Sequence, residues 1–492
     1  MPHTIPAAAL RQFIAGKWED GDGAGLASDN PARPGETVAA GRQATAEQLE
    51  RAVAAASAAA PAWSAVPMHE RGAVLLRAAA LLEGSAGELG LELAREEGKT
   101  LAEGRGEVAR AAQILRYYGN EGDRPAGKVF SSPRRGEQIL VVRKPLGVVG
   151  VVTPFNFPIA IPAWKIAPAL VYGNTVVWKP ASTVPLLAQR LAEVLDGAGL
   201  PKGVLNLVMG PGALGTELVE HPLLDGLTFT GSTGVGRRLA AAGAGRGVPV
   251  QAEMGGKNAA VVLAGADLDL AAEQVMFGAF RSTGQKCTAT SRLVLQDSVA
   301  DDFLVRLTSR LQDWSTGDPV DPSVQMGPLV SASAADGVRR GTDEALAGGA
   351  TLVFQGVLPE EAGDAFIPPT ILELPAGQAD AEVNPAWTDE FFGPVLAVRR
   401  AADAAQAFEW AGQGEYGLSA AVFTQDVTRV LEAVEGIDVG ILHVNSESAG
   451  ADPHVPFGGA RKSGYGPKEQ GQSAKEFFTH TTTVYLRGGN PA

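Results

Sequence analysis

A regular alternation of strand and helix patterns between residues 146 and 253 constrains the fold of this chain more than any other feature. Apolar, β-branched segments typical of buried strands lie at 147–152, 175–178, 204–208, 226–230 and 251–253. Helical patterns fill the intervals, at 160–170, 184–198, 213–219 and 235–242. This alternation predicts a parallel sheet with right-handed crossovers. Nucleotides commonly bind at the carboxyl ends of strands in such sheets.

A second α/β series follows the first. It begins near 258–263 and continues through Val294, Val353 and Ile371 to a strand at 395–398. A chain of 492 residues is too long for one hydrophobic core, and its 45% of hydrophobic residues is enough to fill more than one. We therefore expect two sheet domains.

Two segments outside these series also have a predicted structure. Thr45 and Gln48 have the spacing of a capping box, which predicts a helix that ends at Pro61. A strand at 481–486 has no neighbour in the sequence, so we expect it to pair with 139–142 or with another subunit.

The charge balance limits the possible partners. The net charge is −14, and the acidic residues are spread along the chain. Such a field argues against general nucleic-acid binding, which needs basic patches. One cysteine and six scattered histidines exclude an intrachain disulfide and give no zinc-type spacing, so no metal is expected.

The sequence also indicates a location. Residues 1–20 lack the basic start and apolar core of a secretory signal. The apolar stretch at 146–164 contains Pro154, Pro158 and Pro162, which would break a membrane helix repeatedly. The expected location is the cytoplasm, without a membrane span.

Cys287 is the only cysteine of the chain. A free cysteine is often a small buried hydrophobe, and this alternative has to be weighed first. The small or polar neighbours, GQK before it and Thr288 after it, favour a solvent-reachable loop and a reactive thiol instead.

Two glycine-rich loops join a strand to a helix and are candidates for phosphate binding. The segment GPGALG at 210–215 matches the dinucleotide fingerprint, but Val235 stands near the place where that fingerprint requires an acid. The second loop, TGSTGVG at 230–236, offers the first amides of a helix. From the residues alone, both loops remain candidates.

Six motifs in a fixed order make the chain resemble the aldehyde dehydrogenase superfamily. They are TPFNFP at 153–158, KPAS at 179–182, FTGS at 229–232, EMGGK at 253–257, GQKC at 284–287 and EFFGP at 390–394. The resemblance runs from about residue 13 to 486. It implies an α/β fold with a Rossmann-like cofactor domain (1–126 and 146–253), an α/β catalytic domain (254–470) and a small β oligomerisation arm (127–145 and 471–492).

The resemblance also assigns catalytic roles. Cys287 matches the nucleophile, which attacks the aldehyde as a thiolate. Asn156 and the Cys287 backbone N–H match the donors that hold the resulting oxyanion. Glu253 matches the general base that activates water to hydrolyse the thioester.

The implied cofactor is NADP or NAD. The matching residues are Thr153, Phe155, Lys179, Ser182, Gly212, Gly231, Ser232, Met254, Glu390 and Phe392. Many NAD-preferring relatives carry a glutamate where this chain has Ser182, and that carboxylate would repel a 2′-phosphate. We therefore predict that NADP is accepted and preferred.

Four further residues bear on the substrate. Arg281 resembles the carboxylate-binding arginine of succinate semialdehyde dehydrogenases, although a surface or subunit salt bridge is the alternative. Trp164 stands where one group of those enzymes has a second arginine, so only one carboxylate-binding arginine remains. The loop at 444–459 and the ending at 468–479 are similar to those of family members that oxidise 2,5-dioxopentanoate. Ser446 and Ser448 of this loop could bind the substrate or could equally cap a solvated loop.

The sequence thus predicts oxidation of 2,5-dioxopentanoate to 2-oxoglutarate, with succinate semialdehyde or a broad range of aldehydes as alternatives. The presence of Cys287, Glu253 and Asn156 argues against a non-catalytic protein of this fold. Glu253 also argues against acyl transfer to coenzyme A, because relatives with that activity commonly lack the base. The expected assembly is a homodimer or a homotetramer.

Overall fold

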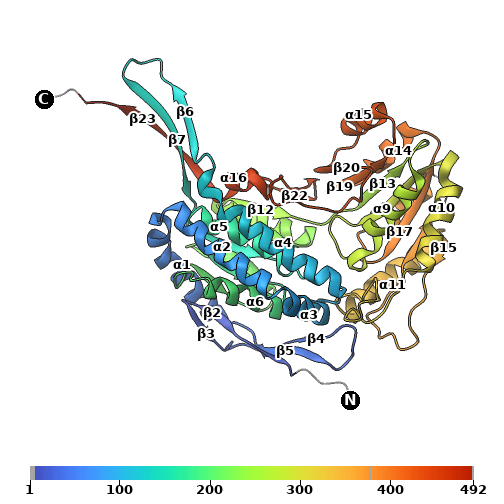
Figure 1. Ribbon diagram of the computed structural model, residues 1–492, viewed down its shortest axis with the longest axis horizontal. Helices are drawn as coiled ribbons and strands as arrows, with labels where there is room; N and C mark the ends of the chain where they lie inside the picture. The colour runs from blue at the N-terminus through green and yellow to red at the C-terminus, as the bar shows by residue number, and fades with distance from the viewer. Residues whose placement is uncertain (1–5, 376–377, 490–492) are drawn as a thin grey trace.

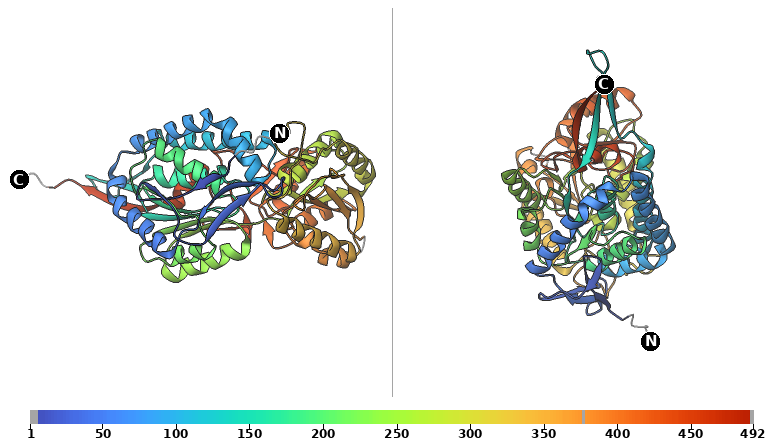
Figure 2. Two further views of the ribbon diagram at one scale, coloured as in Figure 1. Left: turned by 90° about the horizontal axis from the view of Figure 1, so that it is seen from below. Right: turned by 90° about the vertical axis from the view of Figure 1, so that its left-hand side faces the viewer.

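The computed structural model describes residues 6–375 and 378–489. Two lobes lie side by side, each built around its own β-sheet, and a three-stranded arm projects from the first lobe (Figure 1). Figure 2 shows from two further directions that the arm extends well beyond the body of the molecule. No helix of the described residues is long and apolar enough to cross a membrane.

The first lobe contains an eight-stranded sheet in the order β22-β12-β11-β8-β9-β10-β2-β3. Its five central strands are parallel, which confirms the predicted alternation: β12 (Val250–Glu253), β11 (Gly226–Thr230), β8 (Val148–Val152), β9 (Thr175–Lys179) and β10 (Leu205–Leu207). Antiparallel strands complete both edges: β2 (Gln12–Ile14) and β3 (Lys17–Glu19) on one side, β22 (Gly464–Tyr465) on the other.

Helices cover both faces of this sheet. One face packs against α1 (Ala46–Ala65), α7 (Ala213–Glu220) and α8 (Thr233–Arg246). The other face packs against α2 (Met68–Gly84), α3 (Ala86–Glu97), α4 (Leu101–Gly119), α5 (Ala160–Val171) and α6 (Pro185–Gly197). A small sheet of β1 (Ala8–Leu10), β5 (Thr37–Arg42) and β4 (Gly25–Asp29) lies beside α3 and α6.

The predicted capping box of α1 is confirmed, but its predicted end is wrong. Thr45 and Gln48 form both reciprocal hydrogen bonds, and the helix continues through Pro61 to Ala65. The last turn is held by Trp63, which is buried and donates its indole N–H to the Leu170 carbonyl at 3.1 Å. This tertiary contact outweighs the helix-breaking tendency of proline.

The second lobe contains a seven-stranded sheet in the order β15-β16-β17-β14-β13-β19-β20. All pairs are parallel except β15 with β16. The strands are β13 (Asn258–Val262), β14 (Thr290–Gln296), β15 (Thr351–Gln355), β16 (Thr370–Glu373), β17 (Val395–Ala401), β19 (Ser419–Phe423) and β20 (Ile441–Val444). The predicted second series is confirmed, and β19 and β20 extend it.

Helices again flank both faces of the second sheet. One hydrophobic core includes α9 (Leu268–Phe280) and α10 (Asp297–Gln312). The opposite core includes α11 (Ala332–Ala347), α12 (Gln378–Val383), α13 (Pro385–Thr388), α14 (Ala404–Ala411) and α15 (Val427–Gly436). A short ribbon of β18 (Tyr416–Gly417) and β21 (Ala460–Arg461) accompanies this lobe.

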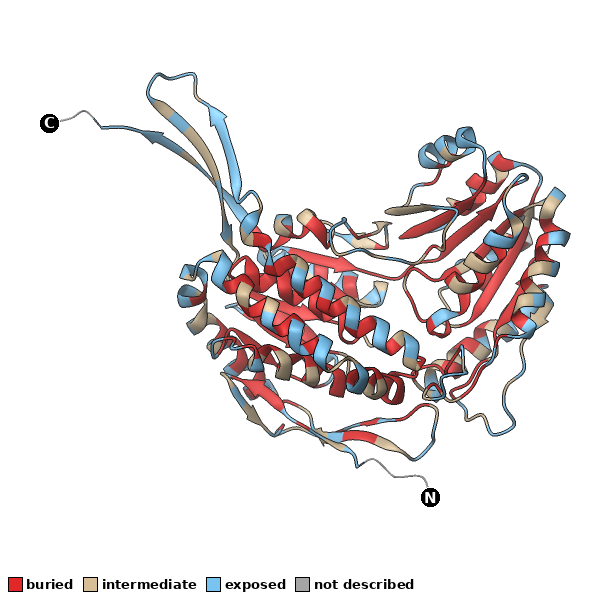
Figure 3. Cartoon of the chain, in the orientation of Figure 1, coloured by how far each residue is buried: buried red, intermediate tan, exposed pale blue. Residues whose placement is uncertain are grey.

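The arm consists of β6 (Gly127–Ser131), β7 (Glu137–Pro145) and β23 (Thr479–Arg487) in the order β23-β7-β6. The antiparallel register pairs Thr482 with Val142 and Tyr485 with Ile139, which confirms the predicted pairing of the C-terminal strand. Most of the arm is exposed (Figure 3).

The chain returns to the first lobe earlier than the predicted boundary at residue 470. β22 already extends the first sheet, and α16 (Ala474–Phe478) buries Phe477 and Phe478 in the core of the first lobe. The segment from 464 to 478 therefore packs with the first lobe, and the arm proper begins at Thr479.

Candidate active site

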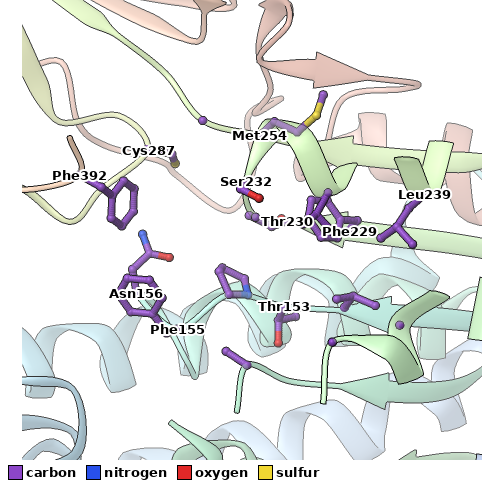
Figure 4. Close-up of a pocket in the computed structure, with 18 of the residues that line it drawn as sticks. Thr153, Phe155, Asn156, Phe229, Thr230, Ser232, Leu239, Met254, Cys287 and Phe392 are labelled. Atoms are coloured by element: carbon purple, nitrogen blue, oxygen red, sulfur yellow. The ribbon is translucent and has the colours of Figure 1, made fainter. Parts of the chain in front are cut away.

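A cavity of about 820 Å³ opens at the carboxyl ends of the strands in the first sheet and extends to the second lobe. All predicted cofactor residues except Ser182 line it, and so do Asn156 and Cys287. Figure 4 shows Cys287, Asn156 and Phe392 at one end, and Phe229 and Leu239 toward the other. The cavity is therefore long enough to separate a reactive end from a binding end.

A left-handed turn presents the thiol. Helix α9 ends at Phe280, and Ser282, Thr283 and Gly284 then have φ values of 55°, 53° and 68°. At Gly284 a Cβ atom would lie 2.3 Å from the Gly393 carbonyl oxygen, so only glycine fits there. The turn reverses the chain and brings Cys287 to the cavity.

The rest of the cysteine loop is more buried than its sequence suggests. Gln285, Lys286 and Thr288 are buried, and Cys287 is half-buried. The expected solvent-reachable loop is thus wrong for the neighbours, because their polar groups bond within the protein: Gln285 Oε1, for example, accepts from the Val330 N–H at 3.0 Å. Asn258 Nδ2 donates to the Cys287 carbonyl at 2.7 Å and fixes the loop from the adjacent strand.

Burial raises the pKa of the Cys287 thiol to about 12, and the carboxylates of Glu390 and Glu253 add to this effect. The backbone N–H groups of Thr288 and Cys287 oppose it by stabilising the thiolate. In this state the thiol carries its proton at neutral pH.

Asn156 lies across the cavity end from the cysteine loop. It is 3% exposed, and its Nδ2 donates to the Gln285 carbonyl at 2.8 Å. A side-chain amide has two N–H donors, so one remains for a ligand. The backbone carbonyl of Asn156 accepts a hydrogen bond from Lys99 Nζ.

Glu253 is the last residue of β12 and is 4% exposed. Its Oε2 accepts from the Gly459 N–H at 3.1 Å, and a Cβ at Gly458 would lie 2.4 Å from its Oε1. Burial, followed by the charge of Glu469, raises the pKa of Glu253 well above its ordinary value. Lys165, which forms a buried ion pair with Glu469, partly offsets this rise.

The binding end has features that suit a dinucleotide. Ser232 caps α8 without a side-chain hydrogen bond, so the first amides of the helix are free to bind a phosphate. At Gly231 a Cβ would lie 2.6 Å from the Phe229 ring. Burial lowers the pKa of Lys179, at the end of β9, to about 8.

Glu390 and two aromatic rings lie nearer the thiol. Glu390 Oε1 accepts from the Gly256 N–H at 3.0 Å, and burial raises the pKa of Glu390 to about 7. A Cβ at Gly255 would lie 2.0 Å from Glu390 Oε2. Phe155 and Phe392 meet edge to face at 5.8 Å. The residues present therefore fit a nicotinamide dinucleotide.

Ser182 lies just outside the cavity lining. Its hydroxyl donates to the Gly210 carbonyl at 2.7 Å, while its neighbour Ala181 lines the cavity. Arg238 also lines the cavity, on the same face of α8 as Val235, and was not predicted from the sequence. Its place in a helix without a recognised motif left no signal for it.

The predicted substrate residues lie in different environments. Arg281 is exposed, stacks over the Phe277 ring at 3.6 Å and lies 3.7 Å from Glu447. Trp164 is buried, 5.5 Å from the Phe457 ring. Ser446 is half-buried.

Ser448 is placed differently from its predicted role. It is fully buried, and its hydroxyl donates to the Thr288 carbonyl at 2.8 Å and bonds Thr290 Oγ1 at 2.7 Å. Because both partners lie within three residues after Cys287, Ser448 supports the cysteine loop from behind. Its hydroxyl is not directed to a substrate.

A dinucleotide-sized cavity with a thiol, an amide and a buried carboxyl group near one end defines an oxidoreductase site that works through cysteine. A model of the aldehyde dehydrogenase family matches residues 18–484. The chain belongs to this family, and it is an enzyme that oxidises aldehydes with NAD or NADP.

Individual relatives agree over nearly the whole length. The chain is 41% identical to alpha-ketoglutaric semialdehyde dehydrogenase of Bacillus subtilis, over 96% of this chain and 97% of that protein. It is 38% identical to 2,5-dioxopentanoate dehydrogenase of Saccharolobus solfataricus, over 96% and 98%. A crystal structure of an NAD-dependent aldehyde dehydrogenase from Sinorhizobium meliloti superposes with a TM-score of 0.94 at 32% identity, covering 100% and 97% of the two chains.

Proposed function

We propose that this enzyme oxidises 2,5-dioxopentanoate to 2-oxoglutarate and prefers NADP to NAD. The observation that supports this choice of substrate is a cluster of charged side chains beside the cysteine loop. The names of the two relatives, which describe the same semialdehyde chemistry, support it.

The cluster offers an arginine that no tight ion pair occupies. Glu447 lies 3.7 Å from Arg281 and 3.6 Å from Lys286, and both distances exceed hydrogen-bond length. Burial lowers the pKa of Lys286, whereas an arginine keeps its charge, so Arg281 is the cation that a substrate would meet. A substrate carboxylate can therefore bind to Arg281 without displacing a tight ion pair.

The reaction follows from the groups at the cavity end. Cys287 loses its thiol proton to solvent water and attacks the aldehyde carbon as the thiolate, while the free N–H of Asn156 and the Cys287 backbone N–H stabilise the oxyanion. Bound nicotinamide supplies the hydride acceptor. Cys287 then carries the acyl group as a thioester. Glu253 takes a proton from the water that hydrolyses it, and the acid product leaves.

The preference for NADP rests on the absence of an acid where the adenosine ribose is expected. Ser182 has a short hydroxyl at this position, and Lys179, three residues earlier at the end of β9, offers a cation. No carboxylate is available at position 182 to repel a 2′-phosphate.

A substrate panel with NADP and NAD tests the proposal. The panel contains 2,5-dioxopentanoate, succinate semialdehyde and hexanal, and kcat/KM should be highest for 2,5-dioxopentanoate with NADP. Higher kcat/KM with hexanal would contradict the carboxylate site, and at least tenfold better efficiency with NAD would reverse the cofactor preference. Higher kcat/KM with succinate semialdehyde would identify the alternative substrate.

Arg281→Ala directly tests whether Arg281 binds the substrate carboxylate. It should raise KM for the two carboxylated aldehydes about tenfold or more, since a charge-assisted hydrogen bond contributes about 1.5–3 kcal/mol. KM for hexanal should stay nearly unchanged. Arg306→Ala, which removes a partly exposed arginine of α10 that pairs with Asp269, is the matched control.

We also propose a homodimer or homotetramer built through the arm. Largely exposed apolar side chains support it: Val129, Phe130, Tyr485 and Leu486 on the arm are 50–73% exposed. The proposed domains are the cofactor domain (1–126 and 146–253), the catalytic domain (254–470) and the arm (127–145 and 471–492), with the segment 464–478 packing against the first lobe. The unpaired thiol of Cys287 suits a reducing compartment, which supports the cytoplasm as the location.

A further inference from the structure

Helix α4 begins between the two loops that carry Asn156 and Cys287. Its first turn is capped by Thr100 and Glu103, which form both hydrogen bonds of a capping box. Glu103 and Glu107 are four residues apart, so they lie one turn apart on the same side of the helix. Each of the two carboxylates contacts a different catalytic loop.

Glu107 holds the loop of Asn156. Its Oε1 accepts from the N–H groups of Ile159 at 2.9 Å and Ala160 at 3.1 Å, where α5 begins. Its Oε2 accepts from Lys99 Nζ at 2.8 Å. The side chains of Glu107 and Lys99 are 1% and 2% exposed, so water competes little for these bonds.

Lys99 extends this contact to the backbone of Asn156. Its ammonium group donates to the Asn156 carbonyl and lies 3.6 Å from the centroid of the Phe157 ring. The ion pair of Lys99 and Glu107 thus fixes the backbone carbonyl of Asn156 and the backbone N–H groups of Ile159 and Ala160.

Glu103 holds the other loop. Its Oε1 accepts from the Ser282 N–H at 2.7 Å. Ser282 has the left-handed conformation that begins the turn toward Cys287. The start of one helix is therefore bonded to both loops, and its position sets the separation of the Asn156 amide from the thiol.

A buried ion pair is costly and is weak evidence for a role in stability. A second carboxyl group beside this ion pair adds to the desolvation cost. Glu97 lies 4.0 Å from Lys99, is fully buried, and its oxygens have no hydrogen-bond partner among the described residues. Apolar side chains of similar volume would fill this space but would not orient a carbonyl group. Small errors of position matter, since a misplacement of about 1 Å can reduce a rate about a hundredfold.

We propose that Lys99 and Glu107 are positioning residues that act through Asn156 to align its amide with the oxygen formed at Cys287. This inference rests on the oxyanion role proposed for Asn156. It predicts that removing the ion pair lowers kcat without weakening the binding of the cofactor.

A double-mutant cycle tests it, with kcat and KM measured for the full-length enzyme. Asn156→Ala should lower kcat about a hundredfold or more. Lys99→Met should lower kcat about tenfold with KM for NADP changed less than about twofold. In the Asn156→Ala background, Lys99→Met should have no further effect, because the group it positions is gone.

Glu107→Gln gives a second cycle with a milder change, since Gln retains an oxygen for the two amides of α5. It decides the question if Lys99→Met does not fold. Arg116→Met is the control. Arg116 lies on α4, away from both loops, and its substitution removes an exposed ion pair with Glu83 of α2. It should leave kcat unchanged.

Three results would overturn the inference. Multiplicative losses of kcat in the double variants would show that Lys99 and Glu107 act independently of Asn156. Wild-type kcat in the single variants would show that the ion pair is not needed. Wild-type kcat in Asn156→Ala would instead refute the proposed role of Asn156, while activity of the wild type on the substrate panel tests the reaction separately.

Discussion

At the scale of single residues, burial disfavours the deprotonated form of two acids, Cys287 and Glu253, that the reaction uses in that form. Burial is the largest cause of the raised pKa of both groups. Neighbouring carboxylates add to it: Glu390 and Glu253 raise the pKa of the Cys287 thiol, and Glu469 raises the pKa of Glu253. Burial also protects a thioester from bulk water once it has formed. The same enclosure therefore slows the activation of the thiol and preserves the intermediate.

Alkylation of Cys287 should reflect its raised pKa. Because only the thiolate reacts, and the pKa of the thiol is about 12, the alkylation rate with iodoacetamide should rise steadily from pH 7 to 10. Below the pKa the thiolate fraction increases about tenfold per pH unit. The measurement is the loss of the single free thiol in the enzyme without cofactor, and a plateau below pH 9 would contradict this prediction.

Glu253→Gln should separate the two halves of the reaction. The amide cannot take a proton from water, so hydrolysis of the thioester should fall about a hundredfold or more. Hydride transfer precedes that step, so rapid mixing should still show a burst of reduced cofactor close to one equivalent per subunit. Absence of the burst would mean that Glu253 is needed earlier, for example to deprotonate Cys287.

The identities of the main site residues could be predicted because they belong to short motifs, but their contacts could not. Ser448 occurs in a loop similar to a substrate loop, yet its hydroxyl is buried behind Cys287. Lys99 and Glu107 lie in an ordinary helical pattern, and only the fold brings them to Asn156. Contacts between distant segments leave no local pattern in a single sequence.

At the scale of elements, the strands of both sheets follow from alternation, while their ends depend on packing. Pro61 predicts the end of α1, but the packing of Trp63 extends this helix by about one turn. The short strand β22 carries no pattern of its own, and it exists because Glu253 and Ala252 pair with it. The wall of the cavity between α7 and α8 is likewise a product of packing.

Arg238 on α8 should contribute to cofactor binding. The facing helix α7 presents small residues to the cavity, among them Ala213 and Thr216, which leaves a slot for a flat base. The guanidinium group of Arg238 is planar and can stack on that base. A cation–π contact at an exposed site contributes about 0.5–1 kcal/mol, so Arg238→Ala should raise KM for NADP and NAD equally, by about two- to fivefold.

Arg237 provides the matched control for this prediction. It is the next residue on α8, is exposed, and is not part of the cavity lining. Arg237→Ala should change neither KM. A loss confined to NADP in Arg238→Ala would show that the side chain binds the 2′-phosphate instead of the base.

At the scale of the whole molecule, two separate parts each bring several exposed apolar side chains together. One is the arm, with Val129 and Phe130 on its edge strand β6. The other is α15, where Val427, Leu431 and Val434 are 60–71% exposed, in the lobe that contains the edge strand β20 (Figure 3). Open strand edges and apolar patches favour association with a second copy of the chain.

Val129→Asp should therefore weaken the assembly. A carboxylate placed in an apolar interface costs several kcal/mol if it stays unpaired, and a loss of about 2.8 kcal/mol raises a dissociation constant about a hundredfold. Val305→Asp is the matched control, because Val305 is 67% exposed on α10, compared with 73% for Val129, and lies far along the chain from the arm. Native mass spectrometry across a dilution series should show smaller species for Val129→Asp, while Val305→Asp should match the wild type. Equal assembly of all three proteins would place the subunit contact elsewhere.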